Sequence, residues 1–242
     1  MQSKAVLVLS TAFIFASASV AGAQIATAYG DQIPSRFSLG GDLTISQPKG
    51  EFANNVPNGY GFDLTGMFRL DPQGYFNLRA DLGGVRYGHE RQRIGFPISG
   101  RLAVDLNTDN QIGFGALGAQ VQIPDGWFRP YANASIAATY FWTESSISGA
   151  DNSESVLSTT NLDDWSHAWI FGGGVMIPFG KSIGALNFGA KYHYGASATY
   201  LKKGDITDNP DGTITLNPRN SKTDLVLWQL GVSFNIPRAS RN

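Results

Sequence analysis

Apolar and polar side chains alternate with a period of two along most of the chain after residue 24. In the last such stretch, 224–236, Trp228, Leu230 and Phe234 fall on one side, while Gln229 and Ser233 fall on the other. A two-residue period is the pattern of a β-strand whose two faces meet different surroundings, whereas a helix repeats every 3.6 residues. The pattern therefore predicts an all-β protein.

Eight segments carry this alternation: 36–48, 59–70, 75–87, 111–123, 129–144, 164–177, 183–201 and 224–236. In the fourth segment, Ile112 and Phe114 are out of phase with Leu117 and Val121. A β-bulge near Gly115 would bring the two halves of that strand into phase, because a bulge inserts one extra residue.

The connections between the eight segments alternate in length. Three are short and rich in Pro, Gly and Asp, which is turn chemistry: 71–74, 124–128 and 178–182. Four are long and polar: 49–58, 88–110, 145–163 and 202–223. A closed sheet with short turns at one rim and long loops at the other produces this order of lengths.

The less apolar face consists mostly of Gly, Ser, Thr, Asn and Gln, with charges of both signs. A soluble barrel or sandwich would turn that face to water and carry many Lys, Glu and Asp on it. Small polar residues with mixed charges fit a confined interior better. We expect a polar network in the lumen made of Asp42, Asp63, Arg69, Arg79, Asp81 and Lys191. Amides would fill the space around it: Asn77, Gln120, Asn133, Asn187 and Gln229.

The aromatic residues of the apolar face gather toward the strand ends, where a membrane barrel has its two aromatic girdles. The expected girdle residues are Tyr60, Phe68, Phe76, Tyr140, Trp142, Trp165, Tyr194 and Trp228. Tyr and Trp suit this position because one end of the ring is apolar and the other is wet. The alternative is a secreted β-sandwich in which these rings form an ordinary core.

The amino terminus carries an export pattern. Lys4 precedes the apolar run 5–16, and small residues end at Ala21-Gly22-Ala23, which predicts a signal peptide over 1–23. A periplasmic lead over 24–35, a barrel over 36–236 and a tail over 237–242 would follow. The chain has no cysteine, which excludes disulfides and thiolate metal sites. Its net charge of −1 gives no indication of nucleic-acid binding.

By its signal peptide, its eight alternating segments, its three short turns and its closing strand LWQLGVSF, the sequence resembles the small eight-stranded outer-membrane β-barrels of Gram-negative bacteria. That group includes the OmpA-type transmembrane domain, the opacity-like proteins and the outer membrane protein beta-barrel domain family. The resemblance implies an antiparallel up-and-down transmembrane barrel with short periplasmic turns and long extracellular loops. It also implies an assembly signal in the last strand, formed by Trp228, Leu230, Val232 and Phe234, although NIPRASRN follows where many members stop at the aromatic residue.

The function expected from this pattern is that of a non-enzymatic outer-membrane protein with a structural or surface-interaction role and a filled lumen. A narrow porin-like channel for small solutes or ions is the alternative, and a lipid A-modifying enzyme is a further one. We assign no catalytic residue, metal or cofactor, because His89, His167 and His193 show no triad pattern and no G-x-S-x-G motif occurs. The expected partners are outer-membrane lipids, lipopolysaccharide and the outer-membrane assembly machinery; we expect no nucleic acid, and a monomer.

Two loops carry candidate chemistry. The segment 89–101 is basic, and Arg91, Arg93 and Arg101 could contact lipopolysaccharide phosphates or simply be solvated. The segment 204–212 contains four carboxylate or amide side chains, Asp205, Asp208, Asn209 and Asp211. These could bind calcium, although the same residues are equally good turn chemistry.

Overall fold

The computed structural model describes residues 36–95, 103–149, 157–179, 183–209, 211 and 213–236. The expected signal peptide, periplasmic lead and C-terminal tail lie outside these residues, as does Arg101 of the basic loop.

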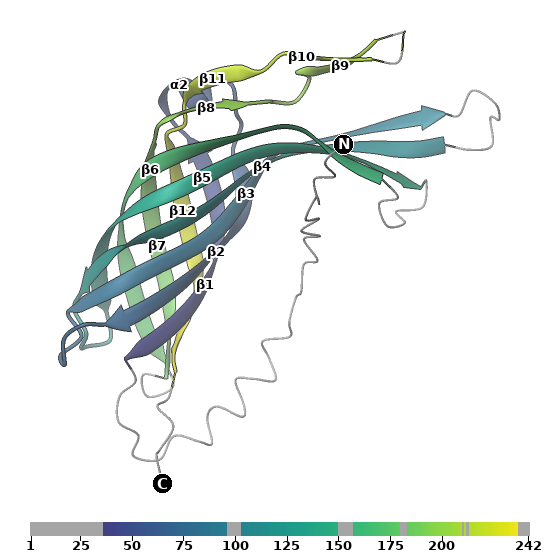
Figure 1. Ribbon diagram of the computed structural model, residues 1–242. Coiled ribbons are helices and arrows are strands. Elements are labelled where there is room, and N and C mark those ends of the chain that lie inside the picture. The colour runs from purple at the N-terminus through teal and green to yellow at the C-terminus, as the bar shows by residue number, and fades with distance from the viewer. Residues whose placement is uncertain are drawn as a thin grey trace, which may run out of the picture. The chain divides into compact units, whose positions relative to one another are not determined.

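Eight antiparallel strands close into a barrel (Figure 1). They are β1 (Phe37–Pro48), β2 (Gly59–Arg69), β3 (Phe76–Gly95), β4 (Ala103–Gln122), β5 (Arg129–Gly149), β6 (Leu157–Phe179), β7 (Gly184–Gly195) and β12 (Leu225–Asn235). Successive strands pair with each other, and β1 pairs with β12 to close the ring. The predicted fold class, an eight-stranded up-and-down barrel, is confirmed.

The strands are staggered around the ring. From Asn235 on β12, the register leads once around the barrel and returns to β12 at Leu225, ten positions away. The successive cross-strand partners along this path are Ser38, Met67, Arg79, Gly118, Ser135, Ile170 and His193. Such a stagger belongs to strands tilted by roughly 35–45°. Tilted strands of about 9–11 residues suffice to cross a bilayer.

The two faces of the strands are as the sequence predicts. Trp228, Leu230 and Phe234 point outward and are 55%, 52% and 37% exposed, whereas Asp42 and Lys191 point inward and are 6% and 0% exposed. A continuous apolar surface of this kind marks a surface that is covered by something other than water.

Two of the expected long loops are largely strand instead. The β3–β4 pairing runs on to Gly95 and Ala103, and the β5–β6 pairing runs on to Ile147 and Leu157. The four strands project together beyond the rest of the barrel (Figure 1). The prediction of loops over 88–110 and 145–163 is therefore wrong for most of these residues. It failed because both faces of the extension are mainly polar, so the apolar alternation that reveals a strand is missing there.

The expected bulge near Gly115 is also wrong, since β4 pairs with β5 through Gly115 without a shift of register. Ile112 and Phe114 simply point inward, 2% and 4% exposed. The registers shift instead between Arg86 and Gly88, and between Thr143 and Glu144.

The remaining elements lie at the long-loop end of the barrel (Figure 1). They are the helix α2 (Gly50–Ala53) and the short strands β8 (Ser197–Tyr200), β9 (Ile206–Asp208), β10 (Ile214–Leu216) and β11 (Arg219–Lys222). The seventh strand, expected to reach Leu201, leaves the barrel after Gly195, and β8 pairs with β11 instead. Among the described residues, no helix has the length and hydropathy to cross a membrane.

Candidate functional site

A cluster of ion pairs crosses the middle of the barrel. The Lys191 ammonium on β7 lies 2.5 Å from an Asp63 oxygen on β2 and 3.0 Å from an Asp81 oxygen on β3. Arg79, two residues before Asp81 on the same face of β3, pairs with that aspartate at 2.9 Å. Since β1 and β12 separate β2 from β7 in the ring, the Lys191 side chain links well-separated parts of the barrel wall.

Neutral side chains add hydrogen bonds to this cluster, although Asp63 Oδ1 and Gln229 Oε1 have no partner. Arg79 donates to Gln120 Oε1 at 2.5 Å and to Thr65 Oγ1 at 2.9 Å, and Thr65 in turn donates to Asp81 at 2.8 Å. Gln229 donates to Asp63 at 2.7 Å. All of these side chains are buried. Buried charges persist only when they are paired and hydrogen-bonded, and these are.

The other two charged residues expected in the network lie apart from these ion pairs. Asp42 accepts a hydrogen bond of 2.7 Å from Asn187, whose carbonyl accepts one of 2.9 Å from Tyr131. The structure does not bring Arg69 into the cluster: its guanidinium lies against Gly74 in the short β2–β3 turn. The five expected amides, Asn77, Gln120, Asn133, Asn187 and Gln229, are all buried.

The barrel interior toward the long loops is largely apolar, which the sequence reasoning missed. The inward side chains there belong to one apolar cluster with residues of the connecting segments: Phe52, Val56, Val85, Tyr87, Ile112, Phe114, Phe141, Ala198, Tyr200, Leu225 and Leu227. The signal was present in the sequence, because Ile112 and Phe114 stood out of phase and Leu225 and Leu227 interrupted the polar face of the last strand.

Segments from two connections close this end of the barrel. Phe52 of α2 is 0% exposed, and Tyr200 of β8 is 1% exposed. The Tyr87 hydroxyl donates to the Leu201 carbonyl at 2.9 Å, and Asn55 donates to the Tyr200 hydroxyl at 3.2 Å. Among the cavities of the interior is one of about 10 Å³ that His193 helps to line and another of about 10 Å³ that Asp42 helps to line. Each has room for about one water molecule.

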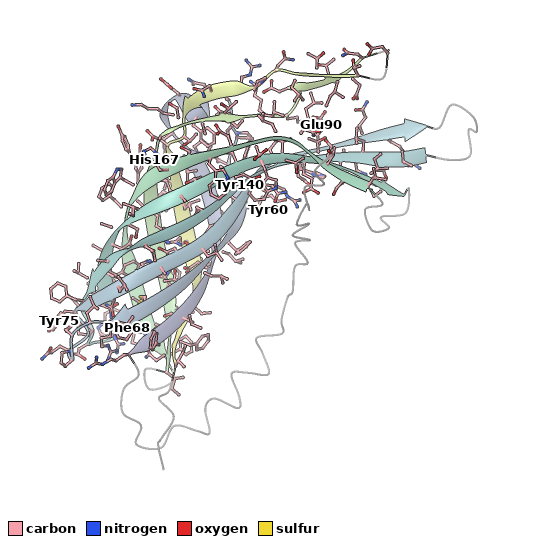
Figure 2. The ribbon with its side chains drawn as sticks, viewed as in Figure 1. Tyr60, Phe68, Tyr75, Glu90, Tyr140 and His167 are labelled. Atoms are coloured by element: carbon pink, nitrogen blue, oxygen red, sulfur yellow. The ribbon has the colours of Figure 1, made fainter. Side chains whose placement is uncertain are left out.

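The expected girdle residues all lie on outward positions of the strands. Tyr60, Phe76, Trp165, Tyr194 and Trp228 are at least 50% exposed. Figure 2 shows Phe68 near the short-turn end, with Tyr75, and shows Tyr60 and Tyr140 further toward the other end.

Rings of each group also contact each other. Phe68 lies 4.8 Å from Phe37 between ring centroids. Tyr140 lies 5.4 Å from Trp142 and 4.7 Å from Trp165.

The residues expected to form an assembly signal share the outward face of β12. Trp228, Leu230, Val232 and Phe234 are 37–55% exposed. The Phe234 ring lies 6.0 Å from Phe179 at an interplanar angle of 84°. These residues therefore form one exposed apolar row at the closing seam of the barrel.

Two contacts between ionisable side chains cross the β3–β4 hairpin of the outer extension. Arg91 lies 2.6 Å from Asp105, and His89 lies 2.8 Å from Asp109, each across the β3–β4 hairpin. Hydrogen bonding from Arg91 holds the pKa of Asp105 below its usual range. Asp105 thus already neutralises the charge of Arg91 within the chain. This pairing weakens the attraction of Arg91 for an external phosphate.

The acidic residues of the 204–212 segment have different partners within the chain. Asp205 is buried and pairs with Arg219 at 3.0 Å, whereas Asp211 accepts hydrogen bonds from the backbone and hydroxyl of Thr213. Within the part of the chain that the structure describes, no three His, Cys, Asp or Glu side chains gather as a metal site.

Comparisons with known proteins agree with this architecture. No protein-family model matches the sequence, and a comparison with curated proteins finds no related sequence. Among solved structures, Neisserial surface protein A (NspA) is similar with a TM-score of 0.52 at 11% identity, over 85% of this chain and 100% of NspA. Ail of Yersinia pestis gives 0.45 at 12% identity, over 84% of this chain and 100% of Ail. The N-terminal barrel of Pseudomonas aeruginosa OprF gives 0.39 at 14% identity, over 84% and 100%.

The likeness to NspA establishes the fold and nothing finer, because the identity is low. The chain thus has the fold of the small eight-stranded outer-membrane β-barrels, as the sequence resemblance implied.

Proposed function

We propose that this chain is an integral outer-membrane protein without enzymatic activity, whose barrel is a sealed anchor and whose outer extension serves surface interaction. The predicted signal peptide over 1–23 would direct its export, and the outward row on β12 would be read by the assembly machinery. Outer-membrane lipids, including lipopolysaccharide, would surround the two aromatic girdles.

The observation that carries the proposal is the set of side-chain contacts that cross the interior. The ion pairs of Lys191 with Asp63 and Asp81 lie across the lumen, and the apolar cluster around Phe52 closes the outer end. A conducting barrel needs a continuous water-filled path, and an eight-stranded barrel is only wide enough for its own side chains.

The arrangement of the histidines supports a non-enzymatic role. His193 is buried against Phe114, His167 lies on the outward face of β6, and His89 is held by Asp109 on the exposed extension. In the described segments, none of the three is hydrogen-bonded to a hydroxyl or amine that could act as a nucleophile.

Planar-bilayer recording of the purified barrel tests the proposal. Folded protein, verified by heat-modifiable gel mobility, should add no steady conductance over the lipid alone. The variant Lys191→Ala/Arg79→Ala/Phe52→Ala, shown to be folded by the same gel shift, removes both cations and the ring at the outer end, and it should raise conductance if these contacts form the seal. Steady, weakly selective current through the unaltered protein would contradict the proposal and favour a narrow channel.

A further inference from the structure

The apolar lining of the outer half of the barrel forms a cup that faces the long-loop end. We call this the outer cup; its wall residues are Val85, Tyr87, Ile112, Phe114, Phe141, Tyr200, Leu225 and Leu227. The interior of an outer-membrane barrel is usually polar, so an apolar cup of this kind needs its own explanation. Concave, mostly apolar spaces with a few polar groups are the places where proteins bind small molecules.

The outer cup already holds a phenyl ring, that of Phe52. Its centroid lies 5.0 Å from that of Tyr200 at 89°, 6.2 Å from that of Phe141 at 88°, and 6.2 Å from that of Tyr87 at 63°. These are edge-to-face contacts, the arrangement that aromatic rings prefer. The wall therefore holds this ring through edge-to-face contacts with three aromatic side chains.

The segment that delivers Phe52 is held by few polar contacts. The helix α2 has four residues, its N-cap Lys49 makes no side-chain capping bond, and Gly50 adopts a positive φ of 55°. The polar anchors of the segment are a 2.8 Å bond from Lys49 N to Asp224 O, a 3.2 Å bond from Asn55 to Tyr200, and a 3.3 Å bond from Lys222 N to Glu51. A single uncapped turn has little stability of its own, so its seating depends mainly on the burial of Phe52 and Val56.

Beneath the ring, the cup contains unpartnered polar atoms. Nε2 of His193 and Oγ1 of Thr139 are buried without a hydrogen-bond partner, and both residues line the cavity of about 10 Å³ that Val85, Phe114 and Leu225 also line. Seven further buried side-chain atoms of the described residues lack a partner in the same way, so these two atoms mark where a ligand substituent could form a hydrogen bond and do not by themselves indicate a ligand. The Lys191 ion pairs close the floor below, so the cup would hold a ligand rather than pass it.

We propose that the outer cup is a binding site for a small aromatic molecule, a single ring with one hydrogen-bonding substituent, and that Phe52 occupies the site in the free protein. Ligand and Phe52 compete for the same aromatic wall. Binding then displaces α2 and exposes Val56 on the outer side. This inference is independent of the proposed surface-interaction role, but it takes the closed floor of the cup from the proposed sealed lumen.

The first measurement is binding of 4-fluorophenol to the folded barrel in nanodiscs, followed by ¹⁹F NMR. Wild-type protein should bind it saturably, and Phe52→Ala should bind it about tenfold more tightly or better, because no resident ring has to leave. The matched control is Met176→Ala, which opens space at a buried position in a separate cluster with Tyr131 and Ala185 and should bind as wild type does. Cyclohexanol, of similar size without aromaticity, should bind more weakly to every variant.

The second measurement keeps Phe52 in place. Because the chain has no cysteine, Val56→Cys introduces a single thiol at a position that is 3% exposed. Saturating 4-fluorophenol should raise its labelling rate by a water-soluble thiol reagent about tenfold or more, whereas the exposed Ala53→Cys should label at an unchanged rate. Binding to Phe52→Ala alone, with no change in Val56→Cys labelling, would reveal only an engineered cavity and overturn the proposal, as would no binding at all.

Discussion

At the scale of single residues, the lumen depends on Lys191. Its ammonium is fully buried and reaches two carboxylates on strands that are not its neighbours. Buried ion pairs contribute little net stability compared with apolar packing, but the loss of one partner leaves an uncompensated charge in the interior. The main effect of removing Lys191 would therefore be to leave Asp63 and Asp81 without this cation in the interior.

Replacement of this lysine should be strongly destabilising. We expect Lys191→Met to lower the free energy of unfolding by about 3–5 kcal/mol, because Asp63 and Asp81 lose their shared cation. Guanidinium-induced unfolding in lipid vesicles measures the change. The control Lys203→Met removes an exposed lysine and should shift the value by less than about 0.5 kcal/mol. Equal effects of the two substitutions would show that the ion pairs are not needed.

A single residue, Asp71, also stabilises the β2–β3 turn. Asp71 accepts hydrogen bonds from the backbone N–H groups of Gly74, Tyr75 and Phe76 at 2.7–3.0 Å. Desolvation acts to raise the pKa of Asp71, but these donors outweigh it and hold the pKa below its usual range. The turn consists of residues 71–74, Asp-Pro-Gln-Gly. Its last residue, Gly74, adopts a φ of 87°, which glycine tolerates because it has no Cβ.

The turn should therefore weaken in acid. A carboxyl whose pKa is lowered by folding stabilises the fold above its unfolded pKa of about 3.9 and loses this effect as the pH falls through the folded pKa. Asp71→Asn should be less stable than wild type at pH 6, and the difference should shrink below about pH 4. Unfolding curves recorded from pH 6 to the acid limit of the folded state measure it; a difference independent of pH would disprove the assigned role of the carboxylate.

At the scale of elements, the outer extension of β3–β6 is built differently from the strands of the barrel. Its cross-strand contacts are polar, such as Thr108 with Ser145 at 3.0 Å and Asn107 with Ser148 at 3.0 Å. The register within the barrel does not depend on them, because β2 has already fixed β3 through pairs up to Tyr60 and Arg86. The extension should thus be separable from the barrel.

Removal of the β3–β4 extension should leave the barrel intact. We expect a variant in which residues 89–109 are replaced by Asn-Gly, a two-residue hairpin turn, to fold with unchanged heat-modifiable mobility. The reason is that residues 76–86 and 111–121 keep their full pairing. Failure of this variant to fold into vesicles, while wild type folds, would show that the extension helps to set the register.

At the scale of the whole barrel, the medium around the strands decides the effect of a surface charge. Leu230 on β12 is 52% exposed and Leu157 on the outer extension is 67% exposed. Exposure alone therefore does not distinguish the surroundings of the two side chains. Only Leu230 lies within the apolar band between the two girdles.

The two leucines should respond differently to arginine. Leu230→Arg should cost about 2–4 kcal/mol in a bilayer, the penalty for a cation near the midplane of a barrel, whereas Leu157→Arg should be nearly neutral. Reversible folding into phospholipid vesicles provides the measurement. Similar costs at both positions would mean that lipid does not surround the barrel.

The sequence by itself determined the local features: which segments are strands, which face of each strand is apolar, and where the short turns lie. These features are readable because a strand between two media imposes a two-residue period, and because turns need Pro, Gly and Asp at fixed places. Prediction from the sequence failed where the two faces of a strand do not differ in polarity. The outer extension is polar on both faces, and Ile112 and Phe114 belong to an interior that is apolar only at that depth.

The tertiary structure alone decided which residues meet across the lumen. Lys191 reaches Asp63 over 128 positions of sequence, and Arg69, equally charged and equally in phase, is left at the rim. The depth of a side chain depends on the stagger of ten positions around the ring, and no single strand encodes that number. The same stagger sets the depth of Tyr87 on β3 and Phe141 on β5, and the connecting segments bring Phe52 and Tyr200 against them, so the outer cup could not be predicted from the strands one by one.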